Sequence, residues 1–184
     1  MQQKNQLRKK YFRLRKKKYY EINKTFFLPL LKLIKSSQKK KFIKLALYYP
    51  SNFEINVLKI LEFNNISIQD ILLPVIDKKK FMKFFSWKKN EILFVNKFGM
   101  LEPAKSKAKL PDIMLVPLLA FDKNKYRLGY GKGFYDRYLN TYLKQFKNIL
   151  TVGVAFSFQK YHKLPISRND VKLDFIITEK GIIK

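Results

Sequence analysis

A glycine-rich stretch at residues 126–136 holds the residue types with the clearest chemical potential in this chain of 184 residues. Gly129, Gly131 and Gly133 alternate within it, and glycine lets a backbone approach a ligand closely or adopt a positive φ angle. The stretch follows an apolar run at 113–116 and precedes a helical pattern. Glycines at such a junction predict a loop that offers backbone N–H groups to a ligand.

Charged side chains in the same stretch indicate the kind of ligand. The start of a helix favours an anion, because its free N–H groups and its dipole present positive charge. Arg127 and Lys132 add two cations, and Asp136 falls in the first predicted helical turn, where a carboxylate could hold a metal ion. Backbone donors, two cations and one carboxylate are the parts needed to hold the phosphates of a magnesium nucleotide.

The spacing of the glycines is not diagnostic by itself. It matches neither the G-x-x-x-x-G-K-[ST] pattern nor the G-x-G-x-x-G pattern of nucleotide-binding loops. A tight turn without a ligand is the alternative, and the glycines alone do not decide between the two readings.

Apolar periodicity predicts alternating helices and strands around this loop. Leu7, Tyr11 and Leu14 recur at helical spacing in a very basic segment at 4–20. This alternation predicts a layered α/β sheet of mostly parallel strands, with ligands bound beyond their carboxyl ends. The other predicted elements are helices at 29–35 and 54–63, a loop at 88–110, strands at 42–49, 71–76, 81–87, 113–116, 150–156 and 174–178, and a helix from Phe134 to about Lys147 in which Phe134, Tyr138, Tyr142 and Phe146 share one face.

The amino-acid composition limits the classes of protein to which this chain can belong. Apolar residues make up 47% of the chain, which excludes wholesale disorder, and the length fits one domain over residues 1–184. The chain has no cysteine, no apolar run long enough to span a membrane and no apolar segment directly behind its basic N-terminus. A cytoplasmic protein without disulfides, membrane span or secretory signal is therefore expected.

The formal net charge of +27 raises the question of a polyanionic partner. Of the 40 basic residues 34 are lysines, whereas recognition of phosphate by paired hydrogen bonds usually relies on arginine. We interpret most of this charge as solvated surface. A basic RNA-associated protein is the alternative function.

Beyond the loop, short motifs run through nearly the whole chain in a fixed order. Residues 111–122 read Pro-Asp-Ile-Met-Leu-Val-Pro-Leu-Leu-Ala-Phe-Asp and lead into the glycine-rich stretch. The accompanying motifs are Lys4-Asn5-Gln6-Leu7-Arg8, Tyr48-Tyr49-Pro50 with Glu54-Ile55, Leu73-Pro74-Val75, Phe84 with Trp87, Phe98-Gly99-Met100-Leu101-Glu102-Pro103, Leu164-Pro165-Ile166, Asp170-Val171 and Leu173-Asp174-Phe175-Ile176-Ile177-Thr178. Together they closely resemble the motifs of the 5-formyltetrahydrofolate cyclo-ligase family, also called 5,10-methenyltetrahydrofolate synthetases.

The resemblance implies a three-layer α/β/α fold with a mostly parallel, Rossmann-like central sheet (NagB/RpiA/CoA-transferase-like). It implies ATP-dependent conversion of 5-formyltetrahydrofolate to 5,10-methenyltetrahydrofolate, with release of ADP and phosphate, through a phosphorylated formyl (imidate) intermediate. ATP and Mg²⁺ are the implied cofactors, and a folate with or without a polyglutamate chain is the implied substrate. A monomer that binds no specific nucleic acid and no membrane is expected.

The resemblance also assigns residues by motif. Without it, Asp174 reads as a cap at the start of a strand. Tyr130 and Leu118 depart from the pattern, because many members have arginine and glycine there, and Tyr130 leaves the loop with one cation fewer. The implied roles are ATP binding by Lys4, Arg8, Arg127, Leu128, Gly129, Tyr130, Gly131, Lys132, Gly133, Phe134 and Tyr135; substrate binding by Tyr49, Glu54, Phe98, Tyr130, Gly131, Lys132, Gly133 and Phe134; metal binding by Asp136 and Asp174; and catalysis by Lys132 and Arg127.

Overall fold

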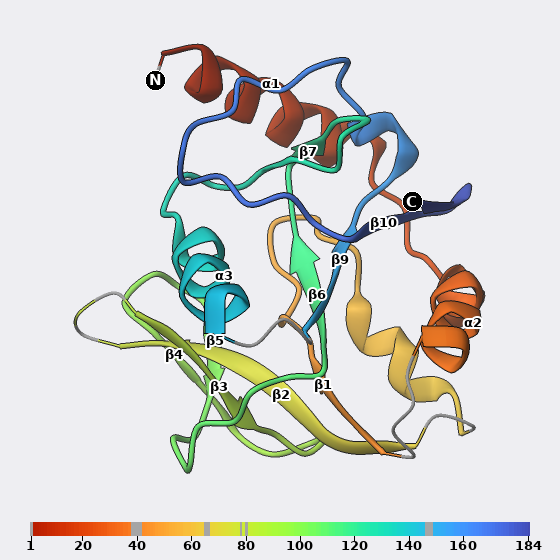
Figure 1. The fold of residues 1–184 in the computed structure, drawn as a ribbon, viewed down its shortest axis with the longest axis vertical. Helices are drawn as coiled ribbons and strands as arrows, with labels where there is room; N and C mark the ends of the chain where they lie inside the picture. The colour runs from red at the N-terminus through yellow and green to blue at the C-terminus, as the bar shows by residue number, and fades with distance from the viewer. Residues whose placement is uncertain (1, 38–41, 65–66, 78, 80, 146–148) are drawn as a thin grey trace.

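Seven strands form the central sheet of the protein, seen in the computed structural model of Figure 1, which describes residues 2–37, 42–64, 67–77, 79, 81–145 and 149–184. The strands are β1 (Ile43–Ala46), β2 (Ile68–Ile76), β3 (Met82–Ser86), β6 (Ile113–Pro117), β9 (Leu150–Val154), β10 (Phe175–Thr178) and β11 (Gly181–Ile183). Their order across the sheet is β11-β10-β9-β6-β1-β2-β3. The strands from β2 to β10 in this order are parallel, and β3 and β11 pair antiparallel at the two edges. The sheet is therefore mostly parallel, as predicted.

Both faces of the sheet are buried, which explains the apolar run at its centre. Along β6, Ile113 and Leu115 belong to the core on one face, and Met114 and Val116 belong to the core on the other. Successive side chains of a strand point to opposite faces, so a strand covered on both sides needs apolar residues at every position.

Helices cover the two faces of the sheet. Helix α2 (Leu28–Ser37) and the short 3₁₀ helices η1 (Lys24–Phe27) and η2 (Val57–Glu62) pack on the face of Leu115. Helix α3 (Phe134–Gln145) packs on the opposite face through Tyr138 and Leu139. Figure 1 shows α2 and α3 on opposite sides of the sheet. The predicted three-layer α/β/α arrangement is confirmed.

Helix α1 (Gln2–Lys18) lies across one end of the sheet instead of on a face. In Figure 1 it crosses the end toward which the β6 arrow points. Leu7 and Tyr11 of α1 pack with Leu119 and Leu128, which belong to the segment that forms the hairpin of β7 (Ala120–Phe121) and β8 (Arg127–Leu128). This packing brings one face of α1 to the carboxyl end of the sheet, where ligands bind in such folds. None of the helices in the described ranges is long and apolar enough to cross a membrane.

Several predicted boundaries and one predicted loop are corrected by the structure. The segment 88–110 contains a hairpin of β4 (Leu93–Val95) and β5 (Leu101–Pro103), whose turn is closed by Asn96 and by Gly99 at a φ of 73°. The predicted helix at 54–63 is 3₁₀ and begins only at Val57. Strands β7, β8 and β11 are too short to show periodicity, and the predicted helical positions Phe146 and Lys147 lie outside the described residues.

Candidate active site

A cavity of about 1260 Å³ opens at the carboxyl ends of the parallel strands. Its wall combines the glycine-rich loop, the first turn of α3, Lys4 and Arg8 of α1, the loop before η2 and the β4–β5 hairpin. Every residue assigned above to ATP, substrate or catalysis lines this cavity, as does Asp136. Those lining residues are Lys4, Arg8, Tyr49, Glu54, Phe98, Arg127, Leu128, Gly129, Tyr130, Gly131, Lys132, Gly133, Phe134, Tyr135 and Asp136.

The three glycines of the loop are not equivalent. Gly131 and Gly133 have φ angles of 97° and 67°, where a side chain is strained, and Gly129 does not. A Cβ atom on Gly131 would lie 3.1 Å from Cζ of Arg8, whereas one on Gly129 would meet no atom within 4 Å. The loop therefore requires glycine at its second and third positions, and it leads directly into the N-terminus of α3.

Helix α1 supplies two cations to the cavity at helical spacing. Nε of Arg8 donates to the carbonyl oxygen of Gly129 at 3.0 Å, which ties α1 to the glycine loop. Lys4 pairs with Asp170 and lies 3.4 Å from Oγ of Ser167. Burial raises the pKa of Asp170, but the hydrogen bonds from Lys4 and Ser167 outweigh that effect and leave the pKa lowered. Lys4 is therefore held at the cavity by a carboxylate that stays ionised.

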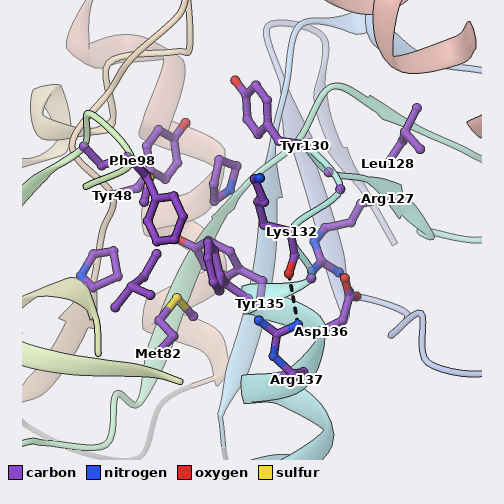
Figure 2. Close-up of a pocket in the computed structure, with 18 of the residues that line it drawn as sticks. Tyr48, Met82, Phe98, Arg127, Leu128, Tyr130, Lys132, Tyr135, Asp136 and Arg137 are labelled. Atoms are coloured by element: carbon purple, nitrogen blue, oxygen red, sulfur yellow. Dashed lines mark hydrogen bonds and ion pairs between the residues drawn. The ribbon is translucent and has the colours of Figure 1, made fainter. Parts of the chain in front are cut away.

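Arg127 and Asp136 form an ion pair beneath the loop. Nη1 of Arg127 lies 2.8 Å from Oδ1 of Asp136, and the arginine side chain is only 3% exposed. The backbone N–H of Val171 also donates to Oδ1, at 3.3 Å. Figure 2 places Arg127, Lys132 and Asp136 on one side of the cavity and Tyr48 and Phe98 on the other.

Glu54 is a buried carboxylate on the other side of the site. Its Oε1 accepts a hydrogen bond of 2.8 Å from the hydroxyl of Tyr130, and its Oε2 accepts one of 3.0 Å from the backbone N–H of Ser51. Burial raises the pKa of Glu54, and the charge of Arg15 opposes that rise together with the hydrogen bonds from Ser51 and Tyr130. Glu54 can thus act as a hydrogen-bond acceptor for a ligand in a largely apolar wall.

Aromatic side chains form much of the remaining wall. The rings of Phe98 and Phe134 have centroids 5.4 Å apart, so the β4–β5 hairpin touches the start of α3. Nζ of Lys132 lies 6.0 Å from the centroid of Phe98. The hydroxyl of Tyr135 is buried and has no hydrogen-bond partner among the described residues. Flat apolar surface with a few polar groups is the usual lining of a site for a ring-containing ligand.

The structure does not bring Asp174 into this cavity. Asp174 precedes β10, and its Oδ2 accepts hydrogen bonds of 2.7 Å from both the backbone N–H and Oγ1 of Thr151. Because β10 begins beside the start of β9, this carboxylate lies toward the amino ends of the parallel strands. It caps a strand here, and no group of three or more potential metal ligands occurs in the described part of the chain.

Sequence reasoning missed Arg15. It lies on the buried stripe of α1 with Leu7 and Tyr11, is 2% exposed, and donates to the hydroxyl of Tyr130. The only signal in the sequence is its i+4 spacing from Tyr11, at a position where an apolar residue is expected. In a segment crowded with lysine and arginine, that signal is easily overlooked. His162, the single histidine of the sequence, is exposed and does not line the cavity.

Known proteins share both the sequence and the fold described above. The model of the 5-formyltetrahydrofolate cyclo-ligase family matches residues 1–179. The 5-formyltetrahydrofolate cyclo-ligase of Haemophilus influenzae is 34% identical over 150 residues, 78% of each chain, and that of Mycoplasma genitalium is 37% identical over 138 residues, 72% of this chain and 70% of the relative.

A solved structure agrees with these relatives. The NMR structure of Aquifex aeolicus 5,10-methenyltetrahydrofolate synthetase has a TM-score of 0.74 and 32% identity, and the match covers 98% of this chain and 92% of that one. A 5,10-methenyltetrahydrofolate synthetase from Mycoplasma pneumoniae has a TM-score of 0.67 and 28% identity over 96% of this chain and 98% of the other. The chain belongs to the 5-formyltetrahydrofolate cyclo-ligase family.

Proposed function

We propose that this protein is an ATP-dependent ligase that closes 5-formyltetrahydrofolate to 5,10-methenyltetrahydrofolate and releases ADP and phosphate. The observation that carries the proposal is a single cavity with two unlike halves. One half has the glycine loop, the α3 N-terminus and several cations, and the other has aromatic rings and a buried Glu54. Membership of the family supports the same activity.

The cationic half suits the phosphates of ATP. Gly131 and Gly133 keep the loop open to close approach, and the start of α3 adds N–H groups and a favourable dipole. Lys4, Arg8 and Lys132 bring positive charge from two directions. Lys132 is exposed within the loop, so it can follow a phosphoryl group as it moves.

Asp136 fits a role as one ligand of a Mg²⁺ ion carried with the nucleotide. Magnesium is usually held by one or two carboxylates together with phosphate oxygens and water. Arg127 and the backbone N–H of Val171 both donate to Oδ1 of Asp136. The second oxygen of a carboxylate carries further lone pairs that can bind a metal ion. When bound, Mg²⁺ would neutralise phosphate charge. Asp174 is not part of this proposal, because Thr151 engages it outside the cavity.

The aromatic half suits the folate. Glu54 accepts hydrogen bonds, and the N–H and amino groups of a pterin ring are paired donors. Tyr49, Phe98 and Phe134 offer ring surfaces for the pterin and aminobenzoyl groups. Tyr135 also lines the cavity and adds a further aromatic side chain to it.

The two halves together allow a two-step reaction. The formyl oxygen attacks the γ-phosphorus of ATP, so that an O–P bond forms and the bond to ADP breaks. N10 then attacks the activated formyl carbon and gives up its proton, and the C–O bond breaks so that the former formyl oxygen leaves as inorganic phosphate. The protein contributes position and positive charge, which dominate phosphoryl transfer. Lys132 can contact the transferred group, whereas Arg127 is buried against Asp136 and acts by positioning it.

Absorbance in the near ultraviolet tests this proposal directly. Purified protein with 5-formyltetrahydrofolate, Mg²⁺ and ATP should develop the methenyl chromophore, and omission of ATP should abolish it. No chromophore from a folded protein that still binds ATP would indicate lost activity or another acceptor. If neither the chromophore nor ATP binding were observed, the RNA-associated alternative would replace the proposal. The cytoplasmic location and the monomeric state stay predictions.

A further inference from the structure

Arg15 occupies an unusual place for a charged residue. It is 2% exposed and lies on the side of α1 that faces the core, in line with Leu7 and Tyr11. Its Nη1 donates to the carbonyl oxygen of Leu118 at 3.1 Å, while its Nε has no hydrogen-bond partner in the part of the chain that the structure describes. Burying a guanidinium costs free energy, so its position calls for a function beyond packing.

The remaining bonds of Arg15 reach the two loops that frame the cavity. Its Nη2 donates to the carbonyl oxygen of Asn52 at 2.7 Å and to the hydroxyl of Tyr130. Asn52 and Phe53 both have positive φ angles, 49° and 62°, so the turn that precedes Glu54 is strained. Arg15 therefore holds a strained turn on one side and the glycine loop on the other.

The direction of the hydrogen bonds is determined by the groups involved. Arginine can only donate, so the hydroxyl oxygen of Tyr130 is the acceptor from Arg15. The single proton of that hydroxyl is then available to Oε1 of Glu54, at 2.8 Å. Ser51 donates to Oε2 from its backbone N–H at 3.0 Å. The Arg15–Tyr130–Glu54 chain thus presents donors to Glu54, as an ionised carboxylate requires.

Other titratable groups lie close enough to Glu54 to interact with its charge. Tyr48, after β1, and Tyr135, in the first turn of α3, both have pKa values raised by burial and by the charge of Glu54, so they stay neutral near pH 7. Burial raises the pKa of Glu54 itself, and Arg15, Ser51 and Tyr130 oppose that rise. Among these groups only Arg15 supplies a positive charge.

We propose that Arg15 and Tyr130 are positioning residues that keep Glu54 ionised and oriented toward the folate, and that they couple its site to the glycine loop. The proposal rests on the function proposed above. Tyr130 belongs to the glycine loop, and its hydroxyl donates to Glu54, so one side chain connects the proposed nucleotide loop to the proposed folate acceptor.

Two variants test the proposal by kinetics. Tyr130→Phe removes the hydroxyl and keeps the ring, and Arg15→Met keeps the length and removes the charge. For both variants we expect the KM for 5-formyltetrahydrofolate to rise about tenfold, which is the effect expected when one charge-assisted hydrogen bond is lost. The KM for ATP should rise less. Because both changes raise the pKa of Glu54, the acid limb of kcat/KM for the folate should move up by about one pH unit.

Matched variants separate positioning from stability. Arg13→Met changes an exposed arginine of the same helix and should alter neither KM nor the acid limb. Arg15→Lys keeps a positive charge but cannot make all the hydrogen bonds of arginine. In this variant the acid limb should therefore lie between its positions in Arg15→Met and in the wild type. Equal rises in both KM values together with an unmoved acid limb in Tyr130→Phe and Arg15→Met would overturn the proposal and leave Arg15 a structural residue.

A measurement that needs no turnover keeps this inference distinct from the proposed reaction. Carbon NMR of glutamate-labelled protein, with the Glu54 signal assigned by its loss in Glu54→Gln, gives the pKa of that carboxyl directly. A higher pKa in Tyr130→Phe and Arg15→Met than in the wild type is expected. An unchanged pKa of Glu54 would refute the proposed role of the Arg15–Tyr130–Glu54 hydrogen bonds, whether or not the wild-type protein forms the methenyl chromophore.

Discussion

The guanidinium of Arg127 and the carboxylate of Asp136 close the glycine loop as a 2.8 Å ion pair between Nη1 and Oδ1. Arg127 belongs to β8 and Asp136 to the first turn of α3, so the pair joins the two ends of the loop. The arginine side chain is 3% exposed and the aspartate side chain 24%. A charge this deeply buried depends on its partner, and the partner also faces the cavity.

Asp136→Asn should therefore weaken both stability and catalysis. We expect the free energy of unfolding to fall by about 3 kcal/mol, because Arg127 keeps a buried charge without its counterion. Turnover should fall by at least about a hundredfold if Asp136 is a magnesium ligand. Urea unfolding and steady-state rates at several Mg²⁺ concentrations measure the two effects on the same preparation.

Arg127→Met is the matched control for that variant. It breaks the same ion pair but leaves the carboxylate in place. It should therefore lower stability by a similar amount, but raise the Mg²⁺ concentration needed for half-maximal rate less than Asp136→Asn does, because a carboxylate that is less well positioned still binds the ion. Wild-type Mg²⁺ dependence in Asp136→Asn would rule out a metal-binding role and leave only the ion pair.

The loop glycines should respond unequally to alanine. Gly131→Ala places a methyl group at a φ of 97° and 3.1 Å from Cζ of Arg8, so we expect the KM for ATP to rise about tenfold. Gly129→Ala meets no atom within 4 Å at an ordinary φ and should change that KM by less than about twofold. Similar losses in both variants would mean that chain flexibility, and not this geometry, governs nucleotide binding.

Much of this fold could be predicted because buried parallel strands and amphipathic helices leave clear periodic patterns. The apolar run at Ile113–Val116 predicted a buried strand, and Tyr138 of α3 lies in the core as its spacing predicted. The resemblance assigned Lys4 and Glu54 to the same site as the glycine loop, and both line one cavity with it, although about fifty residues separate them in the sequence. Periodicity along a single helix or strand is enough to predict which of its faces is buried.

Features that depend on contacts between distant segments could not be predicted. Arg15 looks like any cation of a basic helix until the carbonyl oxygens of Asn52 and Leu118 are seen opposite it. Asp174 matches a motif, but only the pairing of β10 with β9 shows that Thr151 engages its carboxylate. Hydrogen-bond partners of this kind have no periodicity along the chain.

Lys4→Ala should raise the KM for ATP more than the KM for the folate. Lys4 lies at the cavity and is held there by Asp170, so it can reach a phosphate without ordering a free side chain. We expect about a tenfold rise, typical of one charge-assisted hydrogen bond. Lys10→Ala removes an exposed lysine from the same helix and should leave both KM values unchanged. Equal effects of Lys4→Ala on the two substrates would argue against a phosphate contact.

Phe98→Ala should weaken folate binding through loss of an aromatic wall. The ring of Phe98 packs 5.4 Å from that of Phe134 at the cavity edge, so its removal opens the contact between the β4–β5 hairpin and α3. Loss of such a stacking surface is worth about 1–2 kcal/mol, which predicts roughly a tenfold rise in the KM for the folate. Phe94 lies on the same hairpin but is 57% exposed, and Phe94→Ala should have no such effect. If both variants raised the KM equally, the hairpin would act through its overall stability, and Phe98 would have no direct part in binding.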